Sequence, residues 1–223
     1  MIPFLAMAAF FASTPGPLET ARDHEDRPVL EKMAAEYSAA ADQAPGNPEA
    51  QYRAALAGSF LAGVEIELHD RKAAHDTAER GIRFGERAVA LKPDEAEYLR
   101  VLGTLYGQAV TDLMSGLRYG GKAKDAIDKA VQKAPNSSSV YLARGVGNLY
   151  VPAQLGGGPR AAIPDFRKAI ELDPRNAEAY LFLGLSLRDE GQNAEARQAI
   201  AKSLELDPNR LWARQQLEKT PAK

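Results

Sequence analysis

The chain has 223 residues, a formal charge of −2, 45% hydrophobic and 26% charged residues, and no cysteine. A nearly neutral chain lacks the basic face that nucleic-acid binding requires, and the lack of cysteine excludes disulfides, thiolate metal sites and thiol catalysis. Alanine is frequent and β-branched residues are sparse, which favours an all-α fold.

The first 13 residues, MIPFLAMAAFFAS, carry no charged side chain. The run is too short to span a bilayer, which takes about 20 apolar residues, but its length suits the apolar core of a secretory signal. We therefore expect residues 1–20 to be a signal peptide or an N-terminal hydrophobic segment, and the protein to be periplasmic or otherwise exported. No Lys or Arg precedes the run and no clean cleavage site follows it, so a terminal helix of a cytoplasmic protein is the alternative.

From Pro28 onward the chain reads as helices interrupted by Pro, Gly and Asn. Proline closes each predicted unit, because it cannot continue a helix. The predicted domain covers residues 28–219 and comprises a half-unit at 28–45, four helix-pair units at about 48–93, 96–135, 138–174 and 177–208, and a capping helix at 209–219.

The last two units repeat each other, since ELDP recurs with Pro174 and Pro208 exactly one 34-residue period apart. Small residues flank a larger apolar residue at matching places, in Ala162, Phe166, Ala169 and in Ala196, Ile200, Ser203. Glycines at matching places earlier in the units are Gly103, Gly145 and Gly184. Small residues there let two helices pack closely, and the large residue fills the gap between them.

This pattern resembles the tetratricopeptide repeat. The resemblance implies an all-α, right-handed superhelical solenoid of antiparallel helix pairs with a C-terminal capping helix, and a non-enzymatic scaffold function without cofactors. Successive closing prolines are 48, 42, 39 and 34 residues apart, so the earlier units carry extra residues between their two helices. These residues predict either functional loops on one edge or simply longer helices.

The spacing Gly116…Gly121-Lys122 matches a phosphate-binding loop, but Ala123 stands where magnesium binding needs Ser or Thr and no strand precedes it. We interpret Gly120 and Gly121 as the end of one helix and Lys122 as the start of the next. The three histidines, His24, His69 and His75, form neither a metal set nor a catalytic triad in the sequence. Nothing in the sequence predicts catalysis or a metal site.

In the family that the chain resembles, the first helix of each unit lines a concave groove that binds peptides or helices. Carried over by motif position, the partner-binding groove comprises Tyr52, Arg53, Leu56, Arg100, Thr104, Gln108, Leu142, Val146, Tyr150, Leu181, Phe182, Leu185 and Arg188. Some relatives grip a terminal carboxylate with a Lys/Asn/Arg clamp, but the clamp positions here hold Tyr52, Leu56, Val101, Ser139 and Ala143. The groove is predicted to be polar in its first half and apolar in its second, unless the C-terminal helix or residues 1–25 cover the apolar stripe.

We therefore predict a scaffold that binds a protein or peptide partner in its groove. The stretch LGGGPRAAIPDFRKAIEL is also similar to one in exported bacterial repeat proteins, including the subunit associated with TRAP-type transporters, and to one in the regulator-of-microtubule-dynamics family. The transporter resemblance implies the alternative function, a periplasmic ligand-binding accessory with an apolar groove or pore, in a homo-oligomer or a membrane-associated complex.

Overall fold

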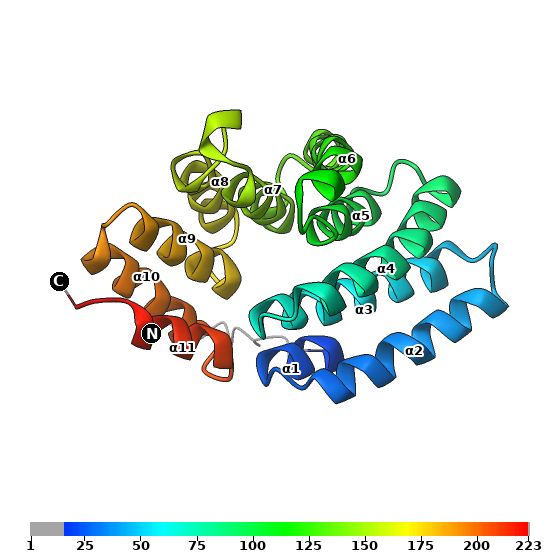
Figure 1. The fold of residues 1–223 in the computed structure, drawn as a ribbon, viewed down its shortest axis with the longest axis horizontal. Helices are drawn as coiled ribbons and strands as arrows, with labels where there is room; N and C mark the ends of the chain where they lie inside the picture. Colours follow the sequence, from blue (N-terminus) through cyan, green and yellow to red (C-terminus); the bar gives the residue numbers. More distant parts are fainter. Residues whose placement is uncertain (1–15, 223) are drawn as a thin grey trace, which may run out of the picture.

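The computed structural model describes residues 16–222, and over this range the chain is entirely helical (Figure 1). The predicted all-α class is therefore confirmed. The predicted signal segment lies mostly outside the described residues. The helices are α1 Pro17–Asp23, α2 Arg27–Gln43, α3 Pro48–Glu67, α4 Arg71–Leu91, α5 Ala96–Gln108, α6 Leu113–Lys133, α7 Ser138–Tyr150, η1 Ala153–Leu155 (a 3₁₀ turn), α8 Pro159–Leu172, α9 Ala177–Asp189, α10 Asn193–Leu206 and α11 Leu211–Lys219.

Polar caps and prolines fix where the helices begin. The side chains of Asn47, Asp70 and Asn176 each accept a hydrogen bond from a backbone N–H in the first turn of the following helix. Asp112 and Ser115 form a reciprocal capping box at the start of α6. These caps satisfy backbone donors that a helix start leaves unpaired, so the short turns between helices are specified locally.

Close helix packing within each pair depends on the glycines that the repeat pattern predicts. A Cβ atom at Gly145 would lie 2.5 Å from the buried ring of Phe166, and one at Gly184 would lie 2.5 Å from the side chain of Ile200. At Gly103 the same atom would lie 2.7 Å from Ile127. Each glycine of one helix thus receives the large apolar residue of its partner helix.

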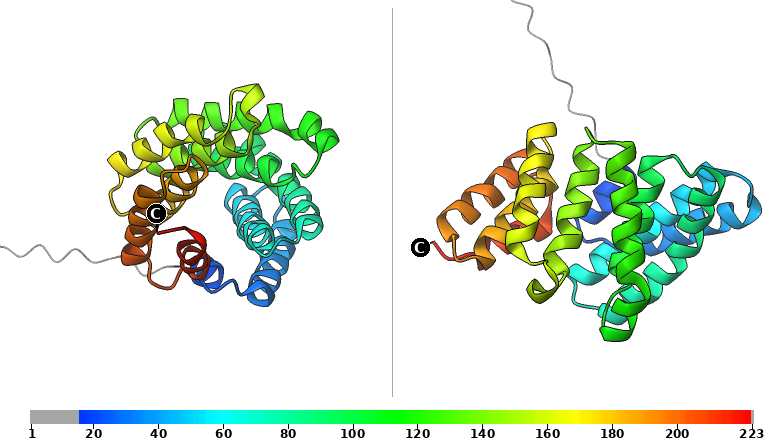
Figure 2. Two further views of the ribbon diagram at one scale, coloured as in Figure 1. Left: turned by 60° about the vertical axis from the view of Figure 1, so that its left-hand side comes forward. Right: turned by 90° about the horizontal axis from the view of Figure 1, so that it is seen from above.

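The helix pairs stack into a superhelix with two unequal sides. Successive first helices, α1, α3, α5, α7 and α9, contact one another, whereas contacts between successive second helices are sparse or absent. The first helices therefore line the inner, concave side, and α4, α6, α8 and α10 form the outer side. In Figure 2 the chain curves round until its last helices return to its first ones.

Two features differ from the sequence expectations, and a choice that the sequence left open, between loops and longer helices, is resolved mostly for longer helices. Gly120 and Gly121 do not end a helix, because α6 runs without interruption from Leu113 to Lys133. The extra residues of the earlier units mostly lengthen helices, as in α3 and α4 with 20 and 21 residues, and only the third forms a loop, around η1. A helix absent from the prediction, α1, packs against α2 and α3 ahead of the half-unit.

Candidate functional site

The first half of the inner face is built from paired aromatic and charged side chains. The ring of Tyr52 stacks on that of Tyr98, with centroids 4.8 Å apart, and its hydroxyl donates to Glu97 at 3.1 Å. Arg100 donates two hydrogen bonds to the same carboxylate, at 2.7 and 2.6 Å. Burial and the Glu97 charge raise the pKa of Tyr52. Tyr52, Glu97 and Arg100 thus form one charge-compensated unit.

The other polar positions predicted in this half also have partners within the chain. The Thr104 hydroxyl donates to the carbonyl of Arg100 at 3.0 Å, and the Gln108 amide donates to the carbonyl of Ser59 at 2.9 Å. Arg53 is exposed and pairs with Glu49 one turn earlier, at 2.8 Å. Of these three, Arg53 has the largest exposed surface for a partner.

Tyr150 is the most exposed of the aromatic side chains on the inner helices, with 65% of its surface accessible. Burial nevertheless raises its pKa, as do the carboxylates of Glu67 on α3 and Asp189 on α9. The side chain is thus exposed to solvent on the inner side of the solenoid, within electrostatic reach of carboxylates on two other inner helices. Leu142 and Val146, on the same helix, are half-buried.

The apolar residues predicted to line the groove in the fourth unit are buried rather than exposed to solvent. Leu181 and Leu185 have exposed fractions of 0% and 5% and pack in one cluster with Ala213 and Trp212 of α11. Assigning Leu181 and Leu185 to a partner-binding groove is therefore wrong, because the C-terminal helix covers them, as the alternative interpretation allowed.

The other two positions of that unit are also engaged with neighbours. The ring of Phe182 lies between those of Phe166 and Trp212, with centroids 5.9 and 5.7 Å away. Arg188 donates to the side-chain oxygen of Gln216 at 3.0 Å. Their contacts with α11 place both residues in the packing of the cap rather than on a free surface.

Sequence reasoning missed the contact that joins the two ends of the solenoid. Arg210, only 1% exposed, precedes α11. Its guanidinium donates a hydrogen bond to Glu178 at 2.8 Å. It also donates to both carboxylate oxygens of Glu67, the last residue of α3. It also donates to the backbone carbonyl of Arg22, 188 positions earlier in the chain, at 3.4 Å.

Further pairs support this closure contact. Arg22 approaches Glu178 at 3.6 Å and Asp207 at 3.9 Å, and Gln215 of α11 donates to Glu25 at 3.1 Å. Burial raises the pKa of the Glu67 carboxyl to about 7, which its hydrogen bonds from Arg210 oppose. The pKa of Arg210 is raised by its two carboxylate partners, so the guanidinium stays charged. The first and last helices of the solenoid are thus joined by a buried ion network in which most charges have an opposite partner.

Residues 16–222 contain neither a metal-binding cluster nor a helix that could span a membrane. Within that range no three His, Asp or Glu side chains come together in a way that could hold a metal ion. None of the helices described there combines the length and the sustained apolarity that crossing a membrane takes.

Part of the chain matches the model of a known repeat family. Residues 156–210 match the model of the tetratricopeptide repeat. A small glutamine-rich tetratricopeptide repeat-containing protein 2 of Mycosarcoma maydis is 33% identical over 96 residues, which is 43% of this chain and 26% of that protein. A probable SPINDLY UDP-N-acetylglucosamine–peptide N-acetylglucosaminyltransferase of Petunia hybrida is 32% identical over 96 residues, which is 42% of this chain. The chain spans about a quarter of the first relative and a tenth of the second.

Structural comparison extends the match over most of the chain. A thermophilic TPR protein of Thermus thermophilus superimposes with a TM-score of 0.65 and 20% identity, covering 90% of this chain and 97% of that one. The HusA haemophore of Porphyromonas gingivalis superimposes with a TM-score of 0.57 and 18% identity, covering 74% and 90%. At these identities the likeness shows the fold alone.

The fold is that of a tetratricopeptide-repeat solenoid, an all-α stack of antiparallel helix pairs, as the resemblance in the repeat pattern implied. The repeat model itself covers residues 156–210, and the same arrangement of antiparallel helix pairs continues through the units before it.

Proposed function

We propose that this solenoid is a non-enzymatic scaffold whose inner face binds a peptide segment of a protein partner. The observation that carries the proposal is Tyr150, an aromatic side chain at the end of the inner helix α7 that is 65% exposed. Exposed aromatic rings in concave surfaces are frequent anchors of binding energy, because they bury a large area at a small cost in side-chain entropy.

The residues around Tyr150 suggest what the partner presents. Val146 and Leu142 offer half-buried apolar surface one and two turns earlier on α7. Of the two carboxylates that act on Tyr150, Glu67 is bonded to Arg210 and Asp189 lies 3.6 Å from Arg188, so both charges are compensated. We therefore propose a peptide that places an apolar side chain against Tyr150 and polar groups toward Thr104 and Arg53.

The closed ends support this function by fixing the inner face before a partner arrives. A surface that is already ordered loses less conformational entropy on binding, so more of the contact energy appears as affinity. The alternative, a carrier with an apolar groove or pore, has less support, because Leu181 and Leu185, which would line that groove, are buried under α11.

Selection of random 12-residue peptides displayed on phage tests the inner face without a known partner. Peptides selected on the wild type are expected to bind Tyr150→Ala at least about tenfold more weakly in fluorescence anisotropy, as loss of one interface anchor predicts. The exposed outer-face substitution Lys129→Ala is the matched control and should leave affinity unchanged. Selected peptides that bind Tyr150→Ala as tightly as the wild type would contradict the proposed site.

We also propose export, for which the uncharged run at residues 1–13 is the support. When the chain is expressed with its own N-terminus in a bacterium with a periplasm, we expect a shortened product in the periplasmic fraction. N-terminal sequencing then begins after residue 13. Recovery of the full chain in the cytoplasmic fraction alone, beside a control secreted normally, would overturn export and leave the inner-face proposal intact.

A further inference from the structure

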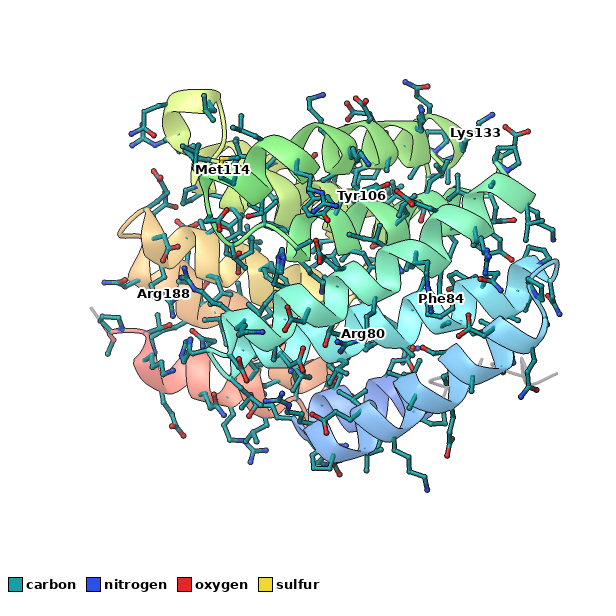
Figure 3. All side chains as sticks on the ribbon, turned by 45° about the vertical axis from the view of Figure 1, so that its right-hand side comes forward. Arg80, Phe84, Tyr106, Met114, Lys133 and Arg188 are labelled. Atoms are coloured by element: carbon teal, nitrogen blue, oxygen red, sulfur yellow. The ribbon has the colours of Figure 1, made fainter. Side chains whose placement is uncertain are left out.

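The buried ion network that joins the first and last helices contains more negative than positive groups. Its members, which we call the seam cluster, come from α1, α3, α9 and the turn between α10 and α11. They are Arg22, Asp23, Glu67, Glu178, Asp207 and Arg210. Figure 3 shows the last helix, α11, beside the first helices at this seam. Four carboxylates and two guanidiniums leave an excess of two negative charges when every group is ionised.

Water cannot fully compensate this excess, because the cluster is buried. The side chains of Arg210, Asp23 and Glu67 are 2%, 3% and 10% exposed, and those of the other members are at most 20% exposed. A charge without a counter-charge in such surroundings is costly, and a buried carboxylate relieves that cost by binding a proton. One bound proton halves the excess charge of the seam cluster.

Glu67 is the carboxylate of the cluster best placed to bind that proton. Its hydrogen bonds come from Arg210, which also bonds to Glu178. Burial raises the pKa of Glu67 to about 7, and the charge of Glu178 adds to this shift while Arg210 opposes it. Burial acts on Glu178 too, but Arg210 and Arg22 outweigh it and lower the pKa of that carboxyl. Burial also raises the pKa of Asp23, against two hydrogen bonds from Arg22 at 2.8 and 2.6 Å.

The groups that face Glu67 from other elements keep their charge state near neutral pH. The turn before α11 presents Arg210, α1 presents Arg22 and α9 presents Glu178. On α7, Tyr150 also feels the Glu67 carboxylate, and burial with this charge raises the pKa of its hydroxyl. The pKa values of both arginines are raised as well. A change of charge at this point of the seam near neutral pH is therefore that of Glu67.

The direction of the pH effect follows from the difference between the closed and the open solenoid. When the ends separate, water solvates Glu67 and its pKa returns to the ordinary value of 4.5. Because closure raises this pKa, the closed form binds more protons than the open form between these two values. The resulting stability is fully present below pH 4.5 and is lost as the pH rises through about 7.

We infer that closure of the solenoid is coupled to the uptake of one proton by Glu67, so that acidification holds the two ends together and a rise above neutral pH weakens their contact. The inference concerns the closure contact and does not depend on what the inner face binds.

Urea unfolding of the full chain at about pH 5.5 and about pH 8.5 measures this coupling in the wild type and in Glu67→Gln, which cannot ionise. Over this range the apparent unfolding constant of the wild type should rise about 30-fold more than that of Glu67→Gln. Glu36→Gln removes an exposed carboxylate on α2 and should follow the wild type. A general loss of stability in Glu67→Gln does not affect the result, because only the change with pH is compared.

A distance measurement shows whether the proton acts on closure. Single-molecule energy transfer between dyes on His24→Cys and Glu218→Cys counts open and closed molecules. Gln215→Ala, which removes the hydrogen bond to Glu25 and none to Glu67, serves as background to raise the open fraction. The ratio of open to closed molecules should be at least about tenfold higher at the alkaline pH, and Glu67→Gln should abolish the change.

Three results would overturn the inference. The first is an unfolding constant whose pH dependence is the same in the wild type and Glu67→Gln. The second is a ratio of open to closed molecules that does not change with pH. The third is a pH-dependent ratio that persists in Glu67→Gln, because another group would then carry the proton.

Discussion

Replacing Arg210 with methionine is expected to lower the free energy of unfolding by about 3–5 kcal/mol, the usual result of removing one partner from a buried ion network. The substitution leaves Glu67 and Glu178 near each other without the guanidinium that bonds to both. It also removes the link between the start of α11 and the end of α3. Urea denaturation measures the loss, and the exposed neighbour Arg214→Met serves as control.

A second variant distinguishes two causes of the lost stability: carboxylates left without a positive partner, and loss of the side-chain packing of Arg210. Adding Glu67→Gln and Glu178→Gln to Arg210→Met removes the uncompensated carboxylates, so most of the lost stability should return. If the triple variant is as unstable as the single one, the guanidinium contributes through its packing against Trp212, whose ring centroid lies 5.4 Å from it. If Arg210→Met is as stable as the wild type, the closure contact does not hold the ends together.

Two alanine substitutions in the same helix are expected to change stability in opposite directions. Gly145→Ala places a Cβ 2.5 Å from the ring of Phe166, a side chain that is fully buried. Overpacking of this kind destabilises a core by about 1–3 kcal/mol. Gly147→Ala meets no atom within 4 Å, and it should stabilise α7 by up to about 1 kcal/mol through helix propensity alone.

Thermal unfolding of both variants tests the packing of the repeat directly. The pair controls for helix propensity, because both positions lie in α7 and exchange the same residues. Equal and stabilising effects at both positions would show that the α7–α8 pair is packed more loosely than the structure has it. A destabilised Gly145→Ala beside a stabilised Gly147→Ala supports the close approach of α7 and α8.

The fold could be predicted because its determinants are local and periodic. Prolines, cap residues and the glycine–aromatic pairs such as Gly145 and Phe166 each act within one helix pair, so a single 34-residue pattern reports them. The interpretation of Gly120 and Gly121 as a helix end was wrong because glycine only weakens a helix interior. The capping box at Asp112 and Ser115 starts α6 before these glycines, and the helix continues through them.

The site was harder to predict because it depends on contacts distant in sequence. Leu181 and Leu185 occupy groove positions of the repeat pattern, but α11 covers them in this chain. Closure depends on Arg210 reaching Glu67, 143 positions away, and no repeat pattern encodes a contact between the two ends. An arginine directly before the capping helix was the one available signal, and it is ambiguous without the fold.

A distance measurement across the two ends tests the central claim, that the solenoid closes on itself and presents a fixed inner face. The chain has no cysteine, so spin labels can be attached at His24→Cys, beside α1, and Glu218→Cys, on α11, both exposed positions. Double electron–electron resonance should give one short, narrow distance in this background and a longer, broad distribution once Arg210→Met is added. A broad distribution that is the same with and without Arg210 would contradict the closed superhelix.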